Sequence, residues 1–203
     1  MYLPSHFREE RLDVMATLMR RHPLATLITV GNGGPLANHL PLLYDPAPEP
    51  FGALRGHLAR ANPQWKMERP EFGALAVFQG PQAYVSPSFY PSKQEHGQVV
   101  PTWNYVTVQA RGKLVIHEDA EWLRQLVTDL TATHEADFAE PWQVTDAPAG
   151  YIDNLLKAIV GVELRIASLD GKWKASQNRN EADRDGVTAG LEDMARIVRG
   201  RER

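Results

Sequence analysis

The residues that could do chemistry gather in three stretches of the chain. The first, RGHLARANPQW from Arg55 to Trp65, places Arg60 just before Asn62 and Pro63, which are typical of a helix start. Free backbone N–H groups at a helix N-terminus, next to an arginine, can bind a phosphate group. A helix that is merely well capped would have the same sequence, so both interpretations stay open.

The second stretch, Gly80 to Tyr105, combines serines, amides, aromatic rings, Lys93 and His96. Much of it falls in a predicted loop from Ser86 to about Pro101, and loops of that length are usually functional. This composition is poor for a core and suits a site that holds a planar heteroaromatic ligand. The third stretch, KWKASQNR, sets a tryptophan between two lysines ahead of several amides.

Several other chemistries are set aside by what the sequence lacks. The chain has no cysteine, which excludes disulfides, thiolate metal sites and thiol catalysis, and which suits a reducing compartment. No two of its seven histidines stand at metal-ligand spacing, so no metal site is expected. It has no G-x-S-x-G elbow, no G-x-G-x-x-G after a strand and no Walker sequence. No general acid or base stands out beyond His57 and His96, and the catalytic residues stay unknown.

Length and charge restrict the class of protein. The 203 residues are expected to form one domain, 1–203. A net charge of −3 argues against a general affinity for nucleic acid. The first residues, MYLPSHFREE, lack the order of a signal peptide, and no apolar run reaches the roughly 18–20 residues of a membrane span. We therefore expect a soluble cytoplasmic protein without membrane contact.

The elements that must position these stretches are mostly strands. A Gly/Asn turn between two apolar runs predicts a hairpin, and alternating patterns predict the other strands. The predicted strands are 25–30, 36–44, 53–58, 73–79, 82–85, 105–117, 160–166 and, after a turn at Asp170-Gly171, 172–174. Helices are predicted at 5–21, in an insertion at about 119–157, and at about 185–199. This pattern predicts a mainly β (α+β) fold, an antiparallel barrel of six or seven strands with peripheral helices.

Six motifs in order along the chain carry a family resemblance. MYLPSHF, NHLPLL, GHLARANPQW, AYVSPSFYPSK, VPTWNY and KWKASQNR resemble the PaiB family, known as FMN-binding negative transcriptional regulators. The resemblance implies FMN as the cofactor and an FMN-binding split barrel, similar to pyridoxamine-phosphate oxidases and flavin reductases. It also implies a homodimer that holds flavin at the subunit interface.

The resemblance also implies where the flavin would lie. It places the ring beside Asn38, His39 and Leu40, the phosphate near His57, Arg60 and Asn62, and an amide, that of Gln82, against the ring edge. The remaining cofactor-binding residues that it implies are Ser92, Lys93, Trp103, Asn104, Lys174, Ser176, Gln177 and Asn178. The oxidases carry a Ser-Arg-Lys cluster where this chain has Ala-Asn-Pro. Phosphate binding must therefore use fewer charges, or Lys93 or Lys174.

Two functions remain open at this point. The family implies a dimeric regulator, and direct DNA binding would then need a local basic face. Such a face could come from Arg8, Arg11, Arg20 and Arg21, or from Arg196, Arg199, Arg201 and Arg203, unless these are solvated residues balanced by nearby carboxylates. The alternative is an FMN-dependent oxidoreductase or flavin reductase, in which the cofactor carries the electron chemistry.

Overall fold

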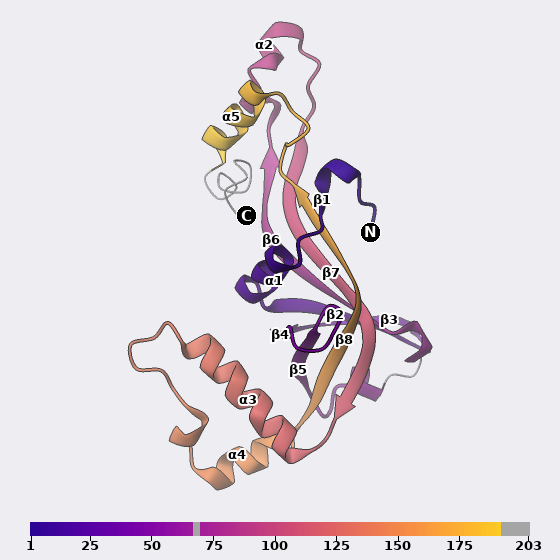
Figure 1. Cartoon of the computed structure of the whole chain (residues 1–203), viewed down its shortest axis with the longest axis vertical. Helices are drawn as coiled ribbons and strands as arrows, with labels where there is room; N and C mark the ends of the chain where they lie inside the picture. The colour runs from indigo at the N-terminus through magenta and orange to yellow at the C-terminus, as the bar shows by residue number, and fades with distance from the viewer. Residues whose placement is uncertain (67–69, 192–203) are drawn as a thin grey trace. The chain divides into compact units, whose positions relative to one another are not determined.

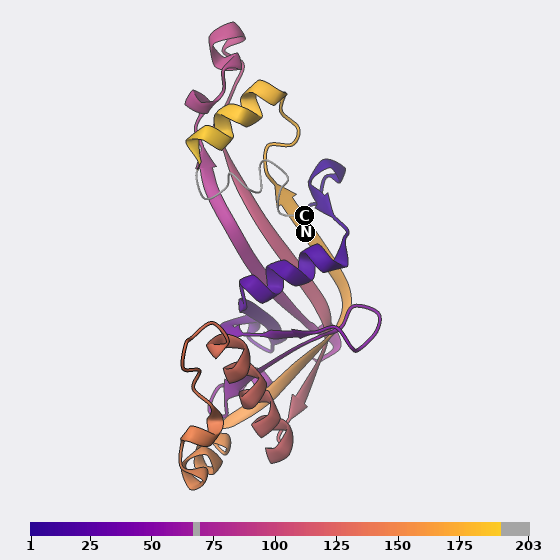
Figure 2. The same cartoon turned by 60° about the vertical axis from the view of Figure 1, so that its left-hand side comes forward.

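The structure is a computed structural model, and it describes residues 1–66 and 70–191 (Figures 1 and 2). Its strands are β1 Arg8–Glu9, β2 Leu24–Gly31, β3 Gly34–Pro41, β4 Leu43–Asp45, β5 Ala53–Ala59, β6 Ala74–Val85, β7 Thr102–His117 and β8 Ile159–Lys174. Its α-helices are α1 Leu12–Arg21, α2 Ser92–His96, α3 Ala120–Glu135, α4 Ala149–Leu156 and α5 Glu181–Gly190. Short 3-10 helices are η1 Ser5–Phe7, η2 Pro63–Lys66, η3 Pro70–Phe72, η4 Pro87–Phe89 and η5 Val144–Asp146.

The eight described strands form one sheet. Its order is β3-β2-β6-β7-β8-β5-β4, with the two-residue β1 pairing beside this path with β8. The pairs β2–β3, β4–β5, β5–β8 and β1–β8 are all antiparallel. The prediction of a mainly β fold with peripheral helices is confirmed, with eight described strands where six or seven were expected.

Two predicted breaks in strands are wrong. β6 runs without interruption through the residues between the two strands expected at 73–79 and 82–85. β8 likewise continues through Asp170 and Gly171, where a turn was expected. Gly171 lies opposite Glu9 in the β1–β8 pair, and a Cβ atom on it would stand 2.8 Å from the Glu9 carbonyl oxygen. The glycine therefore permits a close strand approach and does not form a turn.

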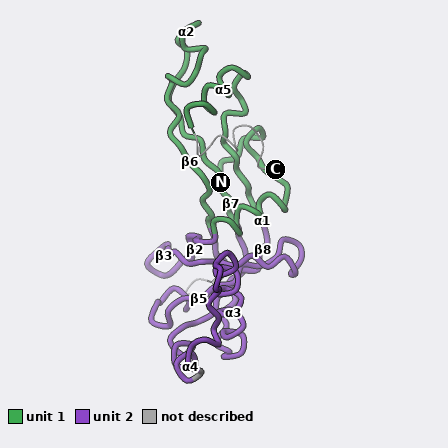
Figure 3. The backbone as a smooth tube through the Cα atoms, turned by 90° about the vertical axis from the view of Figure 1, so that its left-hand side faces the viewer, with its two compact units in different colours: residues 1–22, 77–109, 169–203 green, residues 23–76, 110–168 purple. Residues whose placement is uncertain are grey.

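The chain divides into two compact units, each built from separate segments (Figure 3). Unit 1 comprises residues 1–22, 77–109 and 169 onward, and unit 2 comprises residues 23–76 and 110–168. The long strands β6, β7 and β8 each contribute one stretch to unit 1 and another to unit 2. That residues 1–203 form one domain stays a prediction.

In unit 1, α1 packs on the strands through one apolar face. Val14, Met15, Leu18 and Met19 lie at helical spacing and are buried on this face. A Cβ atom on Gly80 of β6 would lie 2.6 Å from the Leu18 Cδ1 atom, so the helix sits directly on that strand. The helix begins at Leu12 and not at Ser5, because η1 and β1 occupy the preceding residues.

In unit 2, the predicted hairpin is confirmed. β2 and β3 pair from Leu24 opposite Pro41 to Gly31 opposite Gly34, and Gly34 has the positive φ of 107° that such a turn needs. The insertion forms α3, capped by Asp119, and α4. These two helices pack together through a small apolar cluster that contains Leu123, Ile152 and Leu156.

The last described helix, α5, differs from its predicted range. It begins at Glu181, four residues before the expected start, because Asn180 caps it by accepting a hydrogen bond from the Asp183 N–H at 2.8 Å. The predicted helix residues from 192 onward lie outside the described residues, as do the arginines at 196, 199, 201 and 203.

Candidate functional site

A cavity of about 400 Å³ lies in unit 1, on the exposed side of β6 and β7. Successive side chains of a strand point to opposite faces, so Phe78 enters the core while its neighbours line the cavity. The polar lining includes the amides of Gln79, Gln82 and Gln109, the rings of Tyr2 and Tyr105, and Lys172. A cavity of this size with a few polar groups is typical of a small-molecule or cofactor site.

Lys172 is the one lysine or arginine of this lining among the described residues. It is only 8% exposed, and its Nζ donates a 3.0 Å hydrogen bond to the Tyr2 carbonyl oxygen. The ammonium lies 5.3 Å from the centre of the Tyr105 ring and 5.7 Å from that of Tyr2. In the part of the chain that the structure describes, Lys172 makes no ion pair with a carboxylate.

Lys174 follows on the same face of β8, also within unit 1. Its Nζ donates to the Thr102 Oγ1 atom at 2.5 Å and to the Trp103 carbonyl oxygen. Desolvation lowers the pKa of Lys174, and the charges of Lys172 and Arg179 lower it further. This end of β8 therefore concentrates positive charge.

The predicted residues Ser176, Gln177 and Asn178 follow β8 in a turn that is bonded to Asn104 of β7. Asn104 and Ser176 are buried and bonded to each other, with 2.9 Å between the amide nitrogen and the hydroxyl oxygen. The Gln177 side chain accepts from the Ala175 N–H at 2.7 Å and donates to the Trp173 carbonyl oxygen. Asn178 is exposed. Asn104, Ser176 and Gln177 therefore use their side-chain polar groups in hydrogen bonds within the protein.

Ser92, Lys93 and Trp103 differ in their access to a ligand. Ser92 is buried, and both its N–H and its hydroxyl donate to the Asp183 carboxylate, at 3.1 and 2.8 Å. Lys93 is exposed on α2. Trp103 is 53% exposed, with its ring edge-on to that of Tyr84 at 6.0 Å. Lys93 and Trp103 are therefore available to a ligand, whereas the Ser92 hydroxyl already donates its proton to Asp183.

The first predicted stretch lies in unit 2, where amides join β3 to η2. Asn38 donates to the Gln64 Oε1 atom at 2.8 Å. Gln64 is 1% exposed and donates in turn to the carbonyl oxygens of Leu27 and Leu36. Asn62 accepts the Gln64 N–H at 2.9 Å, so it caps η2 as predicted. A second cavity, of about 460 Å³, is lined by residues 36–38 and 61–64.

Arg60 is more fully bonded than a free phosphate-binding arginine would be. Its guanidinium donates to the carbonyl oxygens of Lys157, at 2.9 Å, and Ile159, at 3.2 Å. It also pairs with the Glu118 carboxylate at 2.5 Å. The arginine thus anchors the chain around the start of β8, and the capped-helix interpretation describes this segment. Its predicted contact with phosphate stays a prediction.

The remaining predicted residues of unit 2 have three different environments. Leu40 is buried in the core, whereas His39 is exposed. His57 lies half-buried on β5, opposite Gly161 of β8. Its Nδ1 atom is buried and has no hydrogen-bond partner among the described residues. Desolvation accordingly lowers the pKa of His57 below its ordinary value.

The lowered pKa of His57 predicts a pH-dependent stability. The unfolded chain binds a proton at this histidine more readily than the folded chain does, so stability present above about pH 6.5 is lost as the pH falls. We expect the free energy of unfolding, from urea titrations between about pH 8 and pH 5, to fall less in His57→Asn than in the parent. His39→Asn, at an exposed position, should keep the parental pH dependence. Equal slopes for the parent and His57→Asn would contradict this assignment.

Sequence reasoning did not single out Lys172, the most buried charged residue of the unit 1 cavity. Lys174 was selected from KWKASQNR, whereas Lys172 lines the cavity. The alternation of a strand was a usable signal, since residues 172 and 174 share one face once β8 is known to be continuous. Gln64, which lines the second cavity, was not predicted as a site residue either, and only its burial in the structure draws attention to it.

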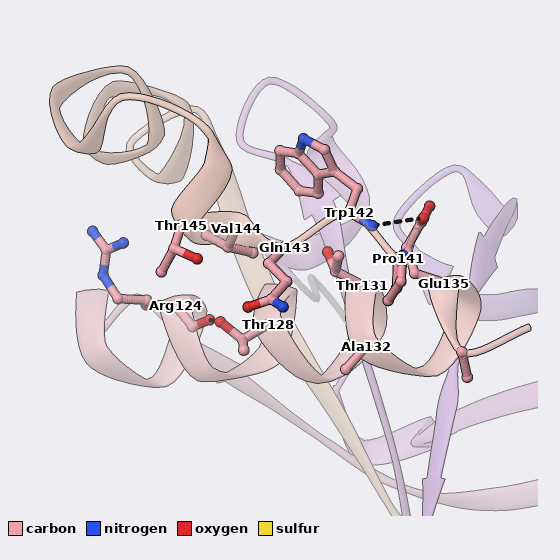
Figure 4. Close-up of a pocket in the computed structure, with 11 residues that line it drawn as sticks. Arg124, Thr128, Thr131, Ala132, Glu135, Pro141, Trp142, Gln143, Val144 and Thr145 are labelled. Carbon is pink, nitrogen blue, oxygen red and sulfur yellow. Dashed lines mark hydrogen bonds between the residues drawn. The ribbon is translucent and has the colours of Figure 1, made fainter. Parts of the chain in front are cut away.

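A third cavity, of about 350 Å³, lies in unit 2 between α3 and residues 141–145 (Figure 4). Its walls carry hydroxyl, amide and apolar groups. Arg124 at its edge already pairs with the Asp153 carboxylate, and Glu135 accepts the Trp142 N–H at 3.1 Å. Both charged groups therefore serve the local structure.

In residues 1–66 and 70–191, no group of three or more His, Cys, Asp or Glu side chains is arranged to hold a metal ion. Within the same ranges, no helix is long and apolar enough to cross a membrane.

Comparison with known proteins gives matches in both sequence and fold. A family described as "Putative FMN-binding domain" matches residues 1–168. The Emericella nidulans uncharacterized protein AN0679 is 36% identical, with 96% of this chain and 91% of that protein covered. The Bacillus subtilis "Protease synthase and sporulation protein PAI 2" is 31% identical, with 95% of this chain and 90% of that protein covered.

The solved structures that resemble this chain share little of its sequence. The flavocytochrome Anf3 of Azotobacter vinelandii has a TM-score of 0.62 at 13% identity, over 87% of this chain and 74% of its own. The conserved hypothetical protein Rv2991 of Mycobacterium tuberculosis has a TM-score of 0.61 at 12% identity, over 89% of this chain and 95% of its own. At such identity the likeness concerns the fold alone, and it confirms the split-barrel class expected from the sequence.

Proposed function

We propose that this chain, which belongs to the PaiB family of FMN-binding proteins, holds its FMN at the interface of a homodimer and acts as a negative regulator of transcription. The observation that carries the proposal is the 400 Å³ cavity of unit 1. Its amides, tyrosine rings and buried cation fit a planar ligand with hydrogen-bonding edges. When bound, FMN supplies the electron chemistry, and the protein supplies binding and orientation.

A homodimer is supported by exposed apolar residues of unit 1. Tyr84, Val100 and Trp103 are 48%, 64% and 53% exposed, although their side chains are large and apolar. Exposed apolar groups of this kind mark interaction surfaces, and a two-fold pair of identical chains is the commonest way to cover them. The same partner would complete a flavin site with residues that one chain alone leaves exposed.

Arg8 and Arg11 do not provide the free basic face that direct DNA binding would need. Arg8 pairs with Glu10 at 3.7 Å, and Arg11 pairs with Glu9 at 2.5 Å. Surface pairs of this kind are solvated, balanced charges and not a free basic face. The regulatory proposal therefore rests on the family, with cytoplasmic location as its accompanying prediction.

The position of the flavin phosphate is part of the proposal. The residues proposed to contact it are Arg60, Lys93 and Lys174, and those proposed around the rest of the flavin are Asn38, His39, Leu40, His57, Asn62, Gln82, Ser92, Trp103, Asn104, Ser176, Gln177 and Asn178. Lys93 gives the cleanest test of a phosphate contact. It is exposed and makes no ion pair in the described chain, so its loss changes no internal contact.

The proposal is tested on the purified chain. We expect a visible flavin spectrum, release of FMN on denaturation, and sedimentation at twice the chain mass of 22.7 kDa. If Lys93 contacts the phosphate, Lys93→Ala should weaken FMN binding about tenfold, as loss of a charged hydrogen bond predicts. Glu121→Ala, on the exposed face of α3, should not change the affinity.

The regulatory part has its own measurement. A regulator that binds DNA directly should shift promoter fragments, and its affinity should fall steeply with salt. Absence of binding at low salt to every fragment, together with reduction of the bound FMN by a nicotinamide, would contradict direct repression and support the alternative oxidoreductase. A monomer that retains FMN would contradict the interface site.

A further inference from the structure

We propose that the unit 1 cavity receives the pyrimidine edge of the flavin ring and that Lys172 is the cation facing that edge. This inference rests on the proposed flavin site and adds a residue to it. Lys172 lies beyond residues 1–168, the part of the chain that the family match covers.

The environment of Lys172 is incomplete without an anion. An ammonium group taken out of water is unfavourable unless opposite charge and hydrogen bonds replace the water. Lys172 has one carbonyl partner, on Tyr2, and two tyrosine rings, but no carboxylate in the described chain. Its Nζ can donate three hydrogen bonds and donates only one to that chain. A partially negative oxygen in the cavity would supply what the protein does not.

The lysine is held in place by structure on both sides. Its backbone pairs with Arg8 in the β1–β8 ladder, which ties the N-terminal segment to this strand. The terminal amine of Met1 lies 3.4 Å from the Asp170 carboxylate, and so secures the same segment again. Because Tyr2 and Lys172 are fixed relative to each other, the cation is preorganised toward the cavity.

The amides around the lysine match the edge of a flavin ring. The pyrimidine part of isoalloxazine presents alternating acceptors and one N–H donor, and each glutamine offers both a donor and an acceptor. Gln79 and Gln82 are exposed on β6 and make no side-chain hydrogen bond to the described chain, so both are free to turn toward a ligand. Tyr105 supplies an aromatic surface beside them.

Charge near this edge would favour the reduced flavin. Reduction places negative charge on the pyrimidine part of the ring, where a neighbouring cation stabilises it more than it stabilises the neutral oxidised ring. Lys174 and Arg179 add to the positive field at the end of β8, where the charges of Lys172 and Arg179 help to lower the pKa of Lys174. Lys172 is thus expected to raise the midpoint potential of the bound flavin.

The test compares Lys172→Met, Lys172→Arg and the parent, each as the full chain. FMN affinity is measured by fluorescence titration for the oxidised form and anaerobically for the dithionite-reduced form. We expect Lys172→Met to bind oxidised FMN about tenfold more weakly, and reduced FMN about a further tenfold more weakly. That additional factor corresponds to a fall of about 30 mV in the two-electron midpoint potential. Lys172→Arg should restore most of both properties.

Two further variants keep the test decisive. Lys113→Met removes an exposed lysine of β7 and should change neither affinity nor potential. Gln82→Glu adds a carboxylate at an exposed cavity position that no internal contact needs, and it should also lower the potential. Gln82→Glu therefore tests whether the cavity holds the flavin even if Lys172→Met does not fold.

The outcomes separate the two proposals. A parent chain that binds no FMN would overturn the proposed function, and this inference with it. A parent that binds FMN, with unchanged affinity and potential in folded Lys172→Met and in Gln82→Glu, would overturn only the assignment of Lys172 and the cavity. Loss of affinity for both redox forms by the same factor would likewise overturn the role in stabilising the reduced ring.

Discussion

Replacing Gly112 by alanine is expected to destabilise the chain by about 3 kcal/mol, a large part of the roughly 5–15 kcal/mol that stabilises a domain. Within unit 2, a Cβ atom at this position of β7 would lie 1.8 Å from the carbonyl oxygen of Arg165 and 2.7 Å from its carbonyl carbon. Both are backbone atoms of β8, so no side-chain rotation relieves the overlap. The two neighbouring strands would have to move apart.

Urea unfolding, followed by circular dichroism, measures this loss directly. In thermal unfolding, a chain of this size loses about 2–4 °C of melting temperature per kcal/mol of lost stability, so the melting temperature should fall by roughly 6–12 °C. Gly33→Ala is the matched control, because no atom lies within 4 Å of a Cβ atom built there. Equal stability of Gly112→Ala and Gly33→Ala would mean that β7 and β8 do not hold this close approach.

The elements that follow from local sequence were predicted well. The hairpin β2–β3 has its turn signal between its own strands, and α3 has its capping residue, Asp119, at its start. A glycine inside a strand, such as Gly112, is typical of a bulge or a bend. The glycine is instead required because the backbone of Arg165, 53 positions later in the chain, passes against it.

The elements that depend on distant partners were not predictable from local signals. Asp170-Gly171 has the composition of a turn, yet β8 continues through it because Arg8 and Glu9 pair with that part of the strand. A turn signal describes what residues favour alone, and hydrogen bonds to a segment about 160 positions away outweigh it.

The candidate site shows the same limit in its side chains. Residue type identified Arg60 and Ser92 as polar groups that could bind a ligand, but their partners are protein atoms far away in sequence. Lys172 and Lys174 stand in one short motif, and only the fold shows which of them lines the cavity. A sequence can therefore predict which groups could bind, whereas the partners already present decide which of them remain available.

Asp183→Ala is expected to cost about 3 kcal/mol and to release α2 from α5. Asp183 is 2% exposed, and its carboxylate accepts the N–H and the hydroxyl of Ser92, which is 4% exposed. Removing the carboxylate leaves two buried donors without a partner, and each unsatisfied donor costs about 1–3 kcal/mol. Hydrogen exchange should show faster exchange of the Ser92 amide, and urea unfolding should show the loss of stability.

Asp185→Ala is the control, since this aspartate is exposed on the same helix and should change stability by less than about 0.5 kcal/mol. Ser92→Ala in the Asp183→Ala background should cost little more, because bonded partners share one interaction energy. If the two losses of stability were additive, Ser92 and Asp183 would not share one interaction. FMN titration of Ser92→Ala then separates the two roles of the serine: a residue that only links α2 to α5 loses stability alone, whereas a flavin contact also loses affinity.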